Sequence, residues 1–244
     1  MSLLRGLSND FGGPPRLICE SGEPPTHCAM PSAIPRPAAL VIGVLALAAA
    51  AACGEKPGAS SRTPAGPAPD SFRVAFATNK GTFVVQANRA WSPNGADRFY
   101  ALASSGFFDD NRFFRVLPGY IAQFGINDQR KVNERWDARP IPDDPARESN
   151  ARGTIVFTAS GPDTRSHQLF INLKDNPKLD SQGFVPFGRV VSGMGVVDSL
   201  YDDYGEAPQQ RLISTLGNNY LLRMFPKLDY ITTARIVGDS APSR

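Results

Sequence analysis

Short runs of alternating or β-branched residues dominate this chain from residue 71 onward. Phe72, Val74 and Phe76 alternate with smaller or polar residues, which is the period of a half-buried strand. Similar runs recur between turn residues at 82–86, 113–117, 120–124, 154–158, 168–172, 185–191 and 231–237. Many short strands with few helices predict a mainly β protein, built as a closed antiparallel barrel.

Helical patterns are few. Ser92 can cap a helix whose first residue is Pro93. Residues 194–201 have helical spacing, and we expect 211–225 to add an extra C-terminal helical segment packed on the barrel. Residues 130–150 have few apolar anchors and several prolines, so we expect a long loop there.

An apolar run at residues 38–52 precedes Cys53 and follows Arg36. Its 15 residues are fewer than the ~20 that a membrane-spanning helix needs. A basic start, an apolar middle and small residues before a cysteine are typical of a lipoprotein signal peptide. The pattern predicts export and lipid attachment at Cys53. Because Gly54 follows, we expect the periplasmic face of an outer membrane as the location.

Signal peptides begin at the start of translation, and the segment from Met30 to the end of the apolar run at Ala52 has 23 residues, a normal signal length. We therefore interpret Met30 as the start. Residues rich in Gly, Ala, Ser and Pro after Cys53 predict a flexible tether. The expected organisation is an extension at 1–29, a signal peptide at 30–52, a lipid-anchored linker at 53–70, a folded domain at 71–238 and a disordered tail at 239–244.

The composition excludes several chemistries. All three cysteines lie before residue 54, so the folded part has neither a disulfide nor a cysteine metal site. A Ser–His–Asp triad around His167 is formally possible, but no Gly-x-Ser-x-Gly motif surrounds Ser166 or Ser181. The net charge of +3 is scattered along the chain, which gives no indication of a nucleic-acid partner.

Three sequence blocks resemble the cyclophilin family. Residues 113–123 read Phe-Phe-Arg-Val-Leu-Pro-Gly-Tyr-Ile-Ala-Gln, which is similar to the family signature. Residues 153–172 and 179–194 resemble its Gly-Pro to Phe-Ile stretch and its Leu-Asp to Gly-Met end. The blocks occur in the family's order, and the resemblance covers about residues 71–238.

The resemblance implies an eight-stranded barrel capped by two helices, with an active groove on its outer face. It implies a peptidyl-prolyl cis–trans isomerase that acts on proline-containing polypeptides without a cofactor or metal. Arg115 matches the arginine that acts on the prolyl amide, and Gln123 matches a glutamine that hydrogen-bonds the substrate backbone. The substrate-binding positions are then Tyr120, Ile121, Thr158, Gln168, Phe170, Leu179 and Phe184.

Rotation about an X–Pro bond makes and breaks no covalent bond, so the scarcity of cysteine and histidine fits this chemistry. Two alternatives stay open. The same groove could belong to a non-catalytic peptide-binding module or holdase chaperone, or the barrel could bind a small ligand. Binding of a small ligand in the barrel is disfavoured, because it gives Arg115 and Gln123 no shared functional role. We expect a monomer.

Overall fold

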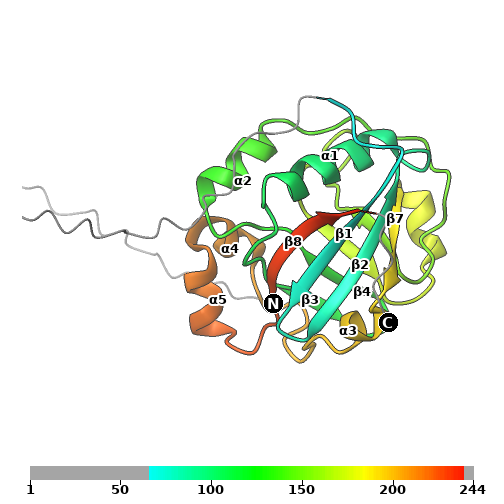
Figure 1. Cartoon of the computed structure of the whole chain (residues 1–244). Coiled ribbons are helices and arrows are strands. Elements are labelled where there is room, and N and C mark those ends of the chain that lie inside the picture. The colour runs from blue at the N-terminus through cyan, green and yellow to red at the C-terminus, as the bar shows by residue number, and fades with distance from the viewer. Residues whose placement is uncertain (1–65, 239–244) are drawn as a thin grey trace, which may run out of the picture. The chain divides into compact units, whose positions relative to one another are not determined.

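The computed structural model describes residues 66–238, which form one antiparallel sheet with helices around it (Figure 1). The strand order is β3-β4-β6-β5-β7-β2-β1-β8. The strands are β1 (Ser71–Thr78), β2 (Gly81–Asn88), β3 (Arg115–Leu117), β4 (Ile121–Phe124), β5 (Thr154–Phe157), β6 (Leu169–Asn172), β7 (Pro186–Ser192) and β8 (Ile231–Val237). The helices are α1 (Pro93–Ser104), α2 (Arg130–Asp137), the 3-10 helix η1 (Pro177–Gln182), α3 (Met194–Asp198), α4 (Gln210–Leu216) and α5 (Asn218–Met224).

The eight-stranded antiparallel fold predicted from the sequence is confirmed. The predicted full closure of the barrel is not, because its two end strands do not pair along their length. The two end strands, β3 and β8, are linked only by an isolated bridge between Arg112 and Tyr230. The Phe113 N–H donates to the Asp229 carbonyl at 3.0 Å, and the Ile231 N–H donates to the Asn111 carbonyl at 2.8 Å. The sheet therefore curls into a barrel that is joined just before β3 rather than along it.

The core is largely aromatic. Phe76 and Phe83 face each other across β1 and β2 with ring centroids 4.9 Å apart. Phe99 on α1 lies 6.2 Å from the Phe76 ring and 4.9 Å from the Phe187 ring, and all four side chains are fully buried. Burial of each such ring contributes ~1.5–3 kcal/mol, which fixes α1 on the inner face of the sheet.

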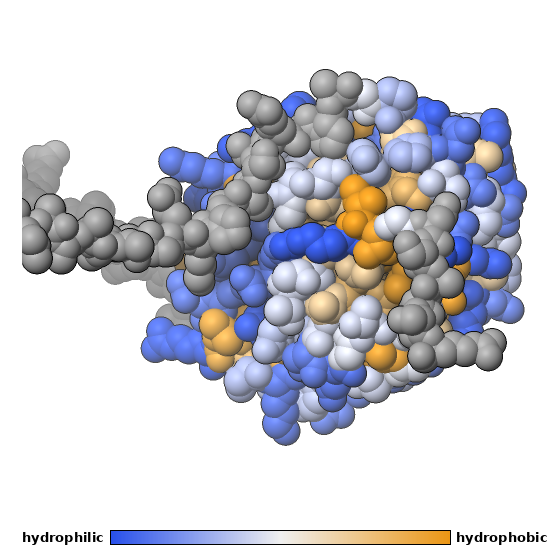
Figure 2. All heavy atoms as spheres, in the orientation of Figure 1, coloured by the Kyte–Doolittle hydropathy of each residue, from blue (hydrophilic) through white to orange (hydrophobic). Residues whose placement is uncertain are grey.

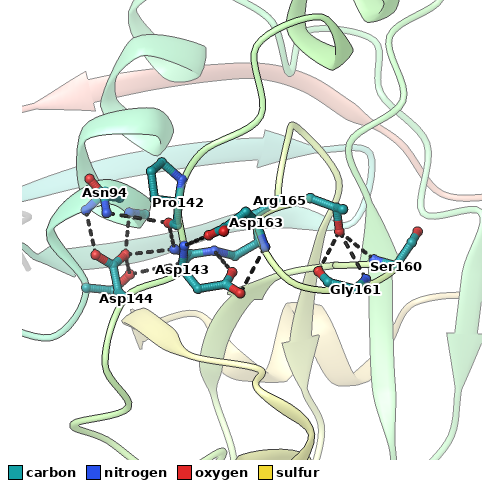
Figure 3. A network of polar contacts seen from close by, with 11 residues as sticks. Asn94, Pro142, Asp143, Asp144, Ser160, Gly161, Asp163 and Arg165 are labelled. Atoms are coloured by element: carbon teal, nitrogen blue, oxygen red, sulfur yellow. Dashed lines mark hydrogen bonds and ion pairs between the residues drawn. The ribbon is translucent and has the colours of Figure 1, made fainter.

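A distant carboxylate caps α1. The sequence predicted Ser92 as the cap, but its side chain makes no capping hydrogen bond and donates to Asp144 instead. Asp144 accepts from the N–H groups of Asn94 at 3.1 Å and Gly95 at 3.0 Å, so it takes the capping role itself. The fully buried Arg165 donates to the same carboxylate at 3.0 Å (Figure 3). Ser92 therefore holds the predicted N-cap position, but the predicted capping by its side chain is wrong, because the capping group comes from a residue 52 positions later.

Helix α2 lies where the sequence predicted part of a long loop. Trp136 anchors this helix on the domain, which the sequence pattern did not indicate. Its side chain is buried, and the guanidinium groups of Arg98 and Arg139 lie 5.1 and 5.4 Å from its ring centroid. Arg130 and Glu134 add an i,i+4 ion pair at 2.6 Å. The prolines of this region begin at Pro140, after the helix has ended, so they limit the helix rather than prevent it.

The predicted C-terminal helical segment is present as two short helices, α4 and α5. They are separated at Gly217, whose φ of +63° lies in the left-handed region. An added Cβ at this glycine would lie 2.4 Å from an Asp128 carboxylate oxygen, so both conformation and space favour glycine. Within residues 66–238, none of the helices has the length and apolar character to cross a bilayer.

The outer face that carries β1, β2 and β8 shows an apolar patch (Figure 2). Val191 on β7, which pairs with β2, and Ile236 and Val237 on β8, which pairs with β1, are exposed large apolar residues of this sheet. Ala68, in the segment expected as linker, is already buried, and its N–H donates to Asp97 at 2.8 Å.

Candidate active site

Strand register places the predicted site residues in one row on the outer face of the sheet. Arg115 on β3 lies opposite Gln123 on β4, and Gln123 lies opposite Phe170 on β6. Side chains of directly opposed residues point to the same face. Because the neighbouring residues Ala122 and Ile171 point into the core, this row must point away from it.

A small apolar cluster lies beside the row. Ile121, Val156, Phe170 and Leu179 are buried and pack together on the side of the sheet opposite the main core. Phe184 meets the Phe170 ring edge-on, with centroids 5.5 Å apart. The cluster gives the outer face an apolar floor and wall.

A groove with a volume of about 390 Å³ opens over this cluster. The structure brings to it both predicted catalytic residues and all seven predicted substrate-binding residues: Arg115, Tyr120, Ile121, Gln123, Thr158, Gln168, Phe170, Leu179 and Phe184. Four lining residues were missed by the sequence reasoning: Ala159, Ser160, Gln182 and Gln210. Ala159 and Ser160 directly follow Thr158, and Gln182 lies between Leu179 and Phe184. Gln210 comes from helix α4, which is distant in the sequence.

A chain of polar side chains crosses the groove. Arg115 Nη1 donates to Gln123 Oε1 at 3.3 Å, and Gln123 Nε2 donates to Gln168 Oε1 at 3.1 Å. Gln123 is nearly fully buried, and both bonds orient its amide. The guanidinium thus lies at one end of the groove, and Gln123 is one of the partners that orient it.

The loop that carries Gln168 is fixed from behind by the buried Arg165. Asp143 and Asp163 exchange hydrogen bonds between side chain and backbone N–H at 2.7 and 3.0 Å (Figure 3). Arg165 also donates to the Pro142 carbonyl. The network joins this loop to the N-terminus of α1 through Asp144.

Glu206 is a second partner of Arg115 that sequence reasoning missed. Its Oε1 accepts from Arg115 Nε at 2.7 Å and also from Nη2. The Glu206 side chain is 63% exposed, and Arg115 keeps 24% of its side-chain surface exposed. The two residues are 91 positions apart, and no local pattern in the sequence connects them.

His167 is buried and structural. Its Nδ1 lies 2.6 Å from the Gly125 carbonyl oxygen and its Nε2 lies 3.0 Å from Asp137 Oδ1. The hydrogen bond from His167 is the main reason that the pKa of Asp137 falls below its ordinary value. Ser166 donates to Asp137 at 3.0 Å, so serine and histidine share the carboxylate and do not form the hydroxyl-to-imidazole contact of a nucleophilic triad.

Other parts of the sequence interpretation lie outside the described residues. These are the extension, the signal peptide, Cys53 with its predicted lipid, most of the linker and the C-terminal tail. Within residues 66–238, no group of three or more His, Cys, Asp or Glu side chains comes together as a potential metal site.

Comparison with known proteins identifies the family. Residues 73–215 match the model of the cyclophilin type peptidyl-prolyl cis-trans isomerase family. A peptidyl-prolyl cis-trans isomerase of Acinetobacter baylyi is 31% identical over 133 residues, which cover 52% of this chain and 70% of the relative. Peptidyl-prolyl cis-trans isomerase A of Dickeya dadantii is 32% identical over 145 residues, covering 57% and 75%.

The fold agrees with these matches. The crystal structure of a Cryptosporidium parvum cyclophilin type isomerase superposes with a TM-score of 0.52 at 18% identity, covering 69% of this chain and 99% of that one. At this identity the likeness concerns the fold alone. Taken with the sequence matches, it leads to one assignment: the chain belongs to the cyclophilin-type peptidyl-prolyl cis-trans isomerase family.

Proposed function

We propose that this domain accelerates cis–trans rotation about X–Pro bonds, with Arg115 as the catalytic group and Gln123 as the residue that orients it and binds the substrate backbone. The observation that carries the proposal is the position of Arg115. Its guanidinium lies in the same cross-strand row as Gln123 and Phe170, at the rim of a groove with an apolar floor.

The chemistry needs little more than a charged donor and a dry pocket. Rotation about the prolyl amide has a barrier of ~18–20 kcal/mol because it breaks the resonance of the C–N bond. A donor that attracts the lone pair of the prolyl nitrogen weakens this resonance. Arginine suits the task because it stays protonated and offers donors in a fixed plane.

The required stabilisation is moderate. A rate increase of about 10⁵ corresponds to ~7 kcal/mol. A preorganised charged donor in a water-poor site contributes ~3–4 kcal/mol. The buried surface of Phe170, Leu179 and Ile121 can hold the proline ring and exclude water, which supplies the remaining stabilisation through positioning and desolvation.

The test compares Arg115→Ala with wild type in an assay limited by proline isomerisation of a short peptide. We expect kcat/KM to fall at least ~100-fold, because a charge-assisted donor is lost from the transition state. Arg130→Ala is the matched control: it also breaks an arginine–glutamate pair, but Arg130 does not line the groove. Equal activity of wild type and Arg115→Ala, with thermal unfolding unchanged, refutes the mechanism.

A non-catalytic peptide-binding module is the second candidate. The pairing of Arg115 with Glu206 favours it, because this contact engages two of the three guanidinium nitrogens. Peptide affinity and isomerisation rate measured on one sample separate the candidates. Binding without rate enhancement identifies a holdase, and binding with rate enhancement identifies the enzyme.

We also propose that the protein is exported and anchored to a membrane through a lipid on Cys53, with folding proteins in the periplasm as substrates. The support is the sequence pattern around residues 38–53. Mass spectrometry of the mature N-terminus tests it, with Cys53→Ala as the comparison. Recovery of wild-type protein from cells with residues before Cys53 intact and no lipid contradicts the proposal.

A further inference from the structure

The charge of the groove is set by a single ion pair. Among the described residues that line it, Arg115 is the one charged side chain. Glu206 neutralises this arginine from the rim, next to a segment that also contributes Gln210 to the lining. A charged side chain of a peptide bound next to Arg115 can therefore interact with this ion pair.

The segment that carries Glu206 is held firmly on the domain. Tyr204 packs edge-on against Tyr201 at 4.9 Å and against Phe225 at 5.1 Å between ring centroids. The Gly205 N–H donates to the Asp202 carbonyl at 2.9 Å, and the Ala207 N–H donates to the Tyr204 carbonyl at 2.9 Å. Glu206 is thus presented from a fixed turn.

The carboxylate uses only one of its oxygens to hold Arg115. Oε1 accepts both guanidinium donors, whereas Oε2 accepts no hydrogen bond from any of residues 66–238. With most of the side chain exposed, Oε2 is accessible to a cation from solvent. Oε2 of Glu206 is therefore the negative atom that a cationic side chain of a bound peptide can contact.

We propose that Glu206 is a specificity-determining residue that makes the groove favour prolines flanked by lysine or arginine and disfavour prolines flanked by acidic residues. The inference rests on the proposed function and names its substrate class. A basic side chain beside the proline pairs with Oε2 while Arg115 keeps its position. An acidic side chain is repelled by Glu206, and it competes poorly for Arg115 because Glu206 is held beside it at high effective concentration.

The test uses blocked peptides Ala-Xaa-Pro-Xaa-Phe with Lys, Gln or Glu at both Xaa positions. One exposed charge contact at about 4 Å in water changes an equilibrium about fivefold. Because attraction of lysine and repulsion of glutamate multiply, we expect kcat/KM for the Lys peptide to exceed that for the Glu peptide by up to about 25-fold at low ionic strength. The preference should weaken in about 1 M salt, where the screening length falls to about 3 Å.

Glu206→Gln keeps the shape of the side chain and removes its charge. In this variant the positive charge of Arg115 is no longer neutralised, so the Lys-to-Glu ratio should fall to one or below. Glu134→Gln is the matched control, because Glu134 also pairs with an arginine but lies on α2, away from the groove. Its ratio should equal that of wild type.

A wild-type ratio of one or less overturns the inference, as does an unchanged ratio in Glu206→Gln or an equal loss in Glu134→Gln. Affinities for the same peptides are measured alongside. If no peptide is isomerised, the proposed function fails, and the ratio of affinities in wild type and Glu206→Gln still decides whether Glu206 selects the charge of the ligand.

Discussion

Asp144→Asn removes one charge from the buried network behind the groove. Asp144 accepts hydrogen bonds from Ser92 and from the N–H groups of Asn94 and Gly95, and it pairs with Arg165. Both ionic side chains are almost completely buried, at 3% and 1% exposed. Asparagine keeps one acceptor oxygen but leaves the guanidinium without its buried counter-charge.

The expected loss of stability is large for a single isosteric change. Removing one partner of a buried ion pair costs ~3–5 kcal/mol. Loss of a helix N-cap costs ~0.5–2 kcal/mol, of which the retained amide oxygen preserves a part. Because Arg165 also donates to the Pro142 carbonyl and lies 3.2 Å from Asp143, we expect the lower end, about 3 kcal/mol. For a domain of this size, the melting temperature then falls by roughly 6–12 °C.

The pH dependence provides an independent check. Burial alone raises the pKa of Asp144, but hydrogen bonds from Ser92, Asn94 and Gly95 and the charge of Arg165 lower it below its ordinary 3.8. A carboxyl whose pKa is lower in the folded state stabilises fully above its unfolded pKa and loses this contribution as pH falls through the folded value. The difference between wild type and Asp144→Asn should therefore be constant near neutral pH and shrink below about pH 4.

Urea unfolding of both proteins at pH 7, 4 and 3 measures this difference. Asp143→Asn is the control with the same change in charge: Asp143 contacts the same arginine, but it is 41% exposed, so we expect a loss below ~1 kcal/mol. Asp144→Asn within ~0.5 kcal/mol of wild type at pH 7, or a difference that does not shrink in acid, refutes the reasoning.

Three further predictions concern the turns, the groove and the buried histidine. Gly193→Ala should destabilise the fold by ~2–4 kcal/mol in denaturant titration, because φ is +77° and the new Cβ lies 2.4 Å from the Thr82 carbonyl oxygen. Gly119→Ala, which also has a positive φ but nothing within 4 Å of the new Cβ, should lose only ~1 kcal/mol, and equal losses contradict the steric argument. Phe184→Ala removes a wall of the apolar cluster and should raise KM about tenfold with a smaller change in kcat, measured in the peptide assay; an unchanged KM argues against its place in the binding site. Asp137→Asn should flatten the loss of stability below about pH 4, since the pKa of Asp137 is lowered chiefly by the hydrogen bond from His167, and an acid unfolding curve identical to wild type contradicts this.

The groove residues were predictable from the sequence because local spacing places them. Arg115 and Gln123 flank a turn at Pro118-Gly119, so the hairpin register that pairs them follows from their eight-residue separation. Gln168 and Phe170 share a face because strand side chains alternate. Strand segments were found for the same reason, although several, such as β3, are shorter than the apolar runs that predicted them.

What the sequence did not reveal depends on contacts between distant segments or on single anchors. Asp144 supplies the capping hydrogen bonds that were predicted for Ser92, from a position 52 residues later, and Glu206 reaches Arg115 across 91 residues. Helix α2 was missed because its stability depends on one buried tryptophan in a mostly polar sequence. The ring of Trp136 is contacted by Arg98 from α1 and by Arg139, which follows the C-cap of α2.

Incomplete closure of the barrel explains why Arg115 has two kinds of partner. In the strand order, β3 is an end strand, so Arg115 has a strand neighbour on one side only, where Gln123 lies. The bridge between Arg112 and Tyr230 joins the sheet just before β3 and stops there. The other side of Arg115 is therefore open to a segment outside the sheet, and Glu206 occupies it. If β3 paired with a further strand, that strand would occupy this position. The gap in the barrel therefore leaves space for Glu206, which neutralises Arg115 at the groove.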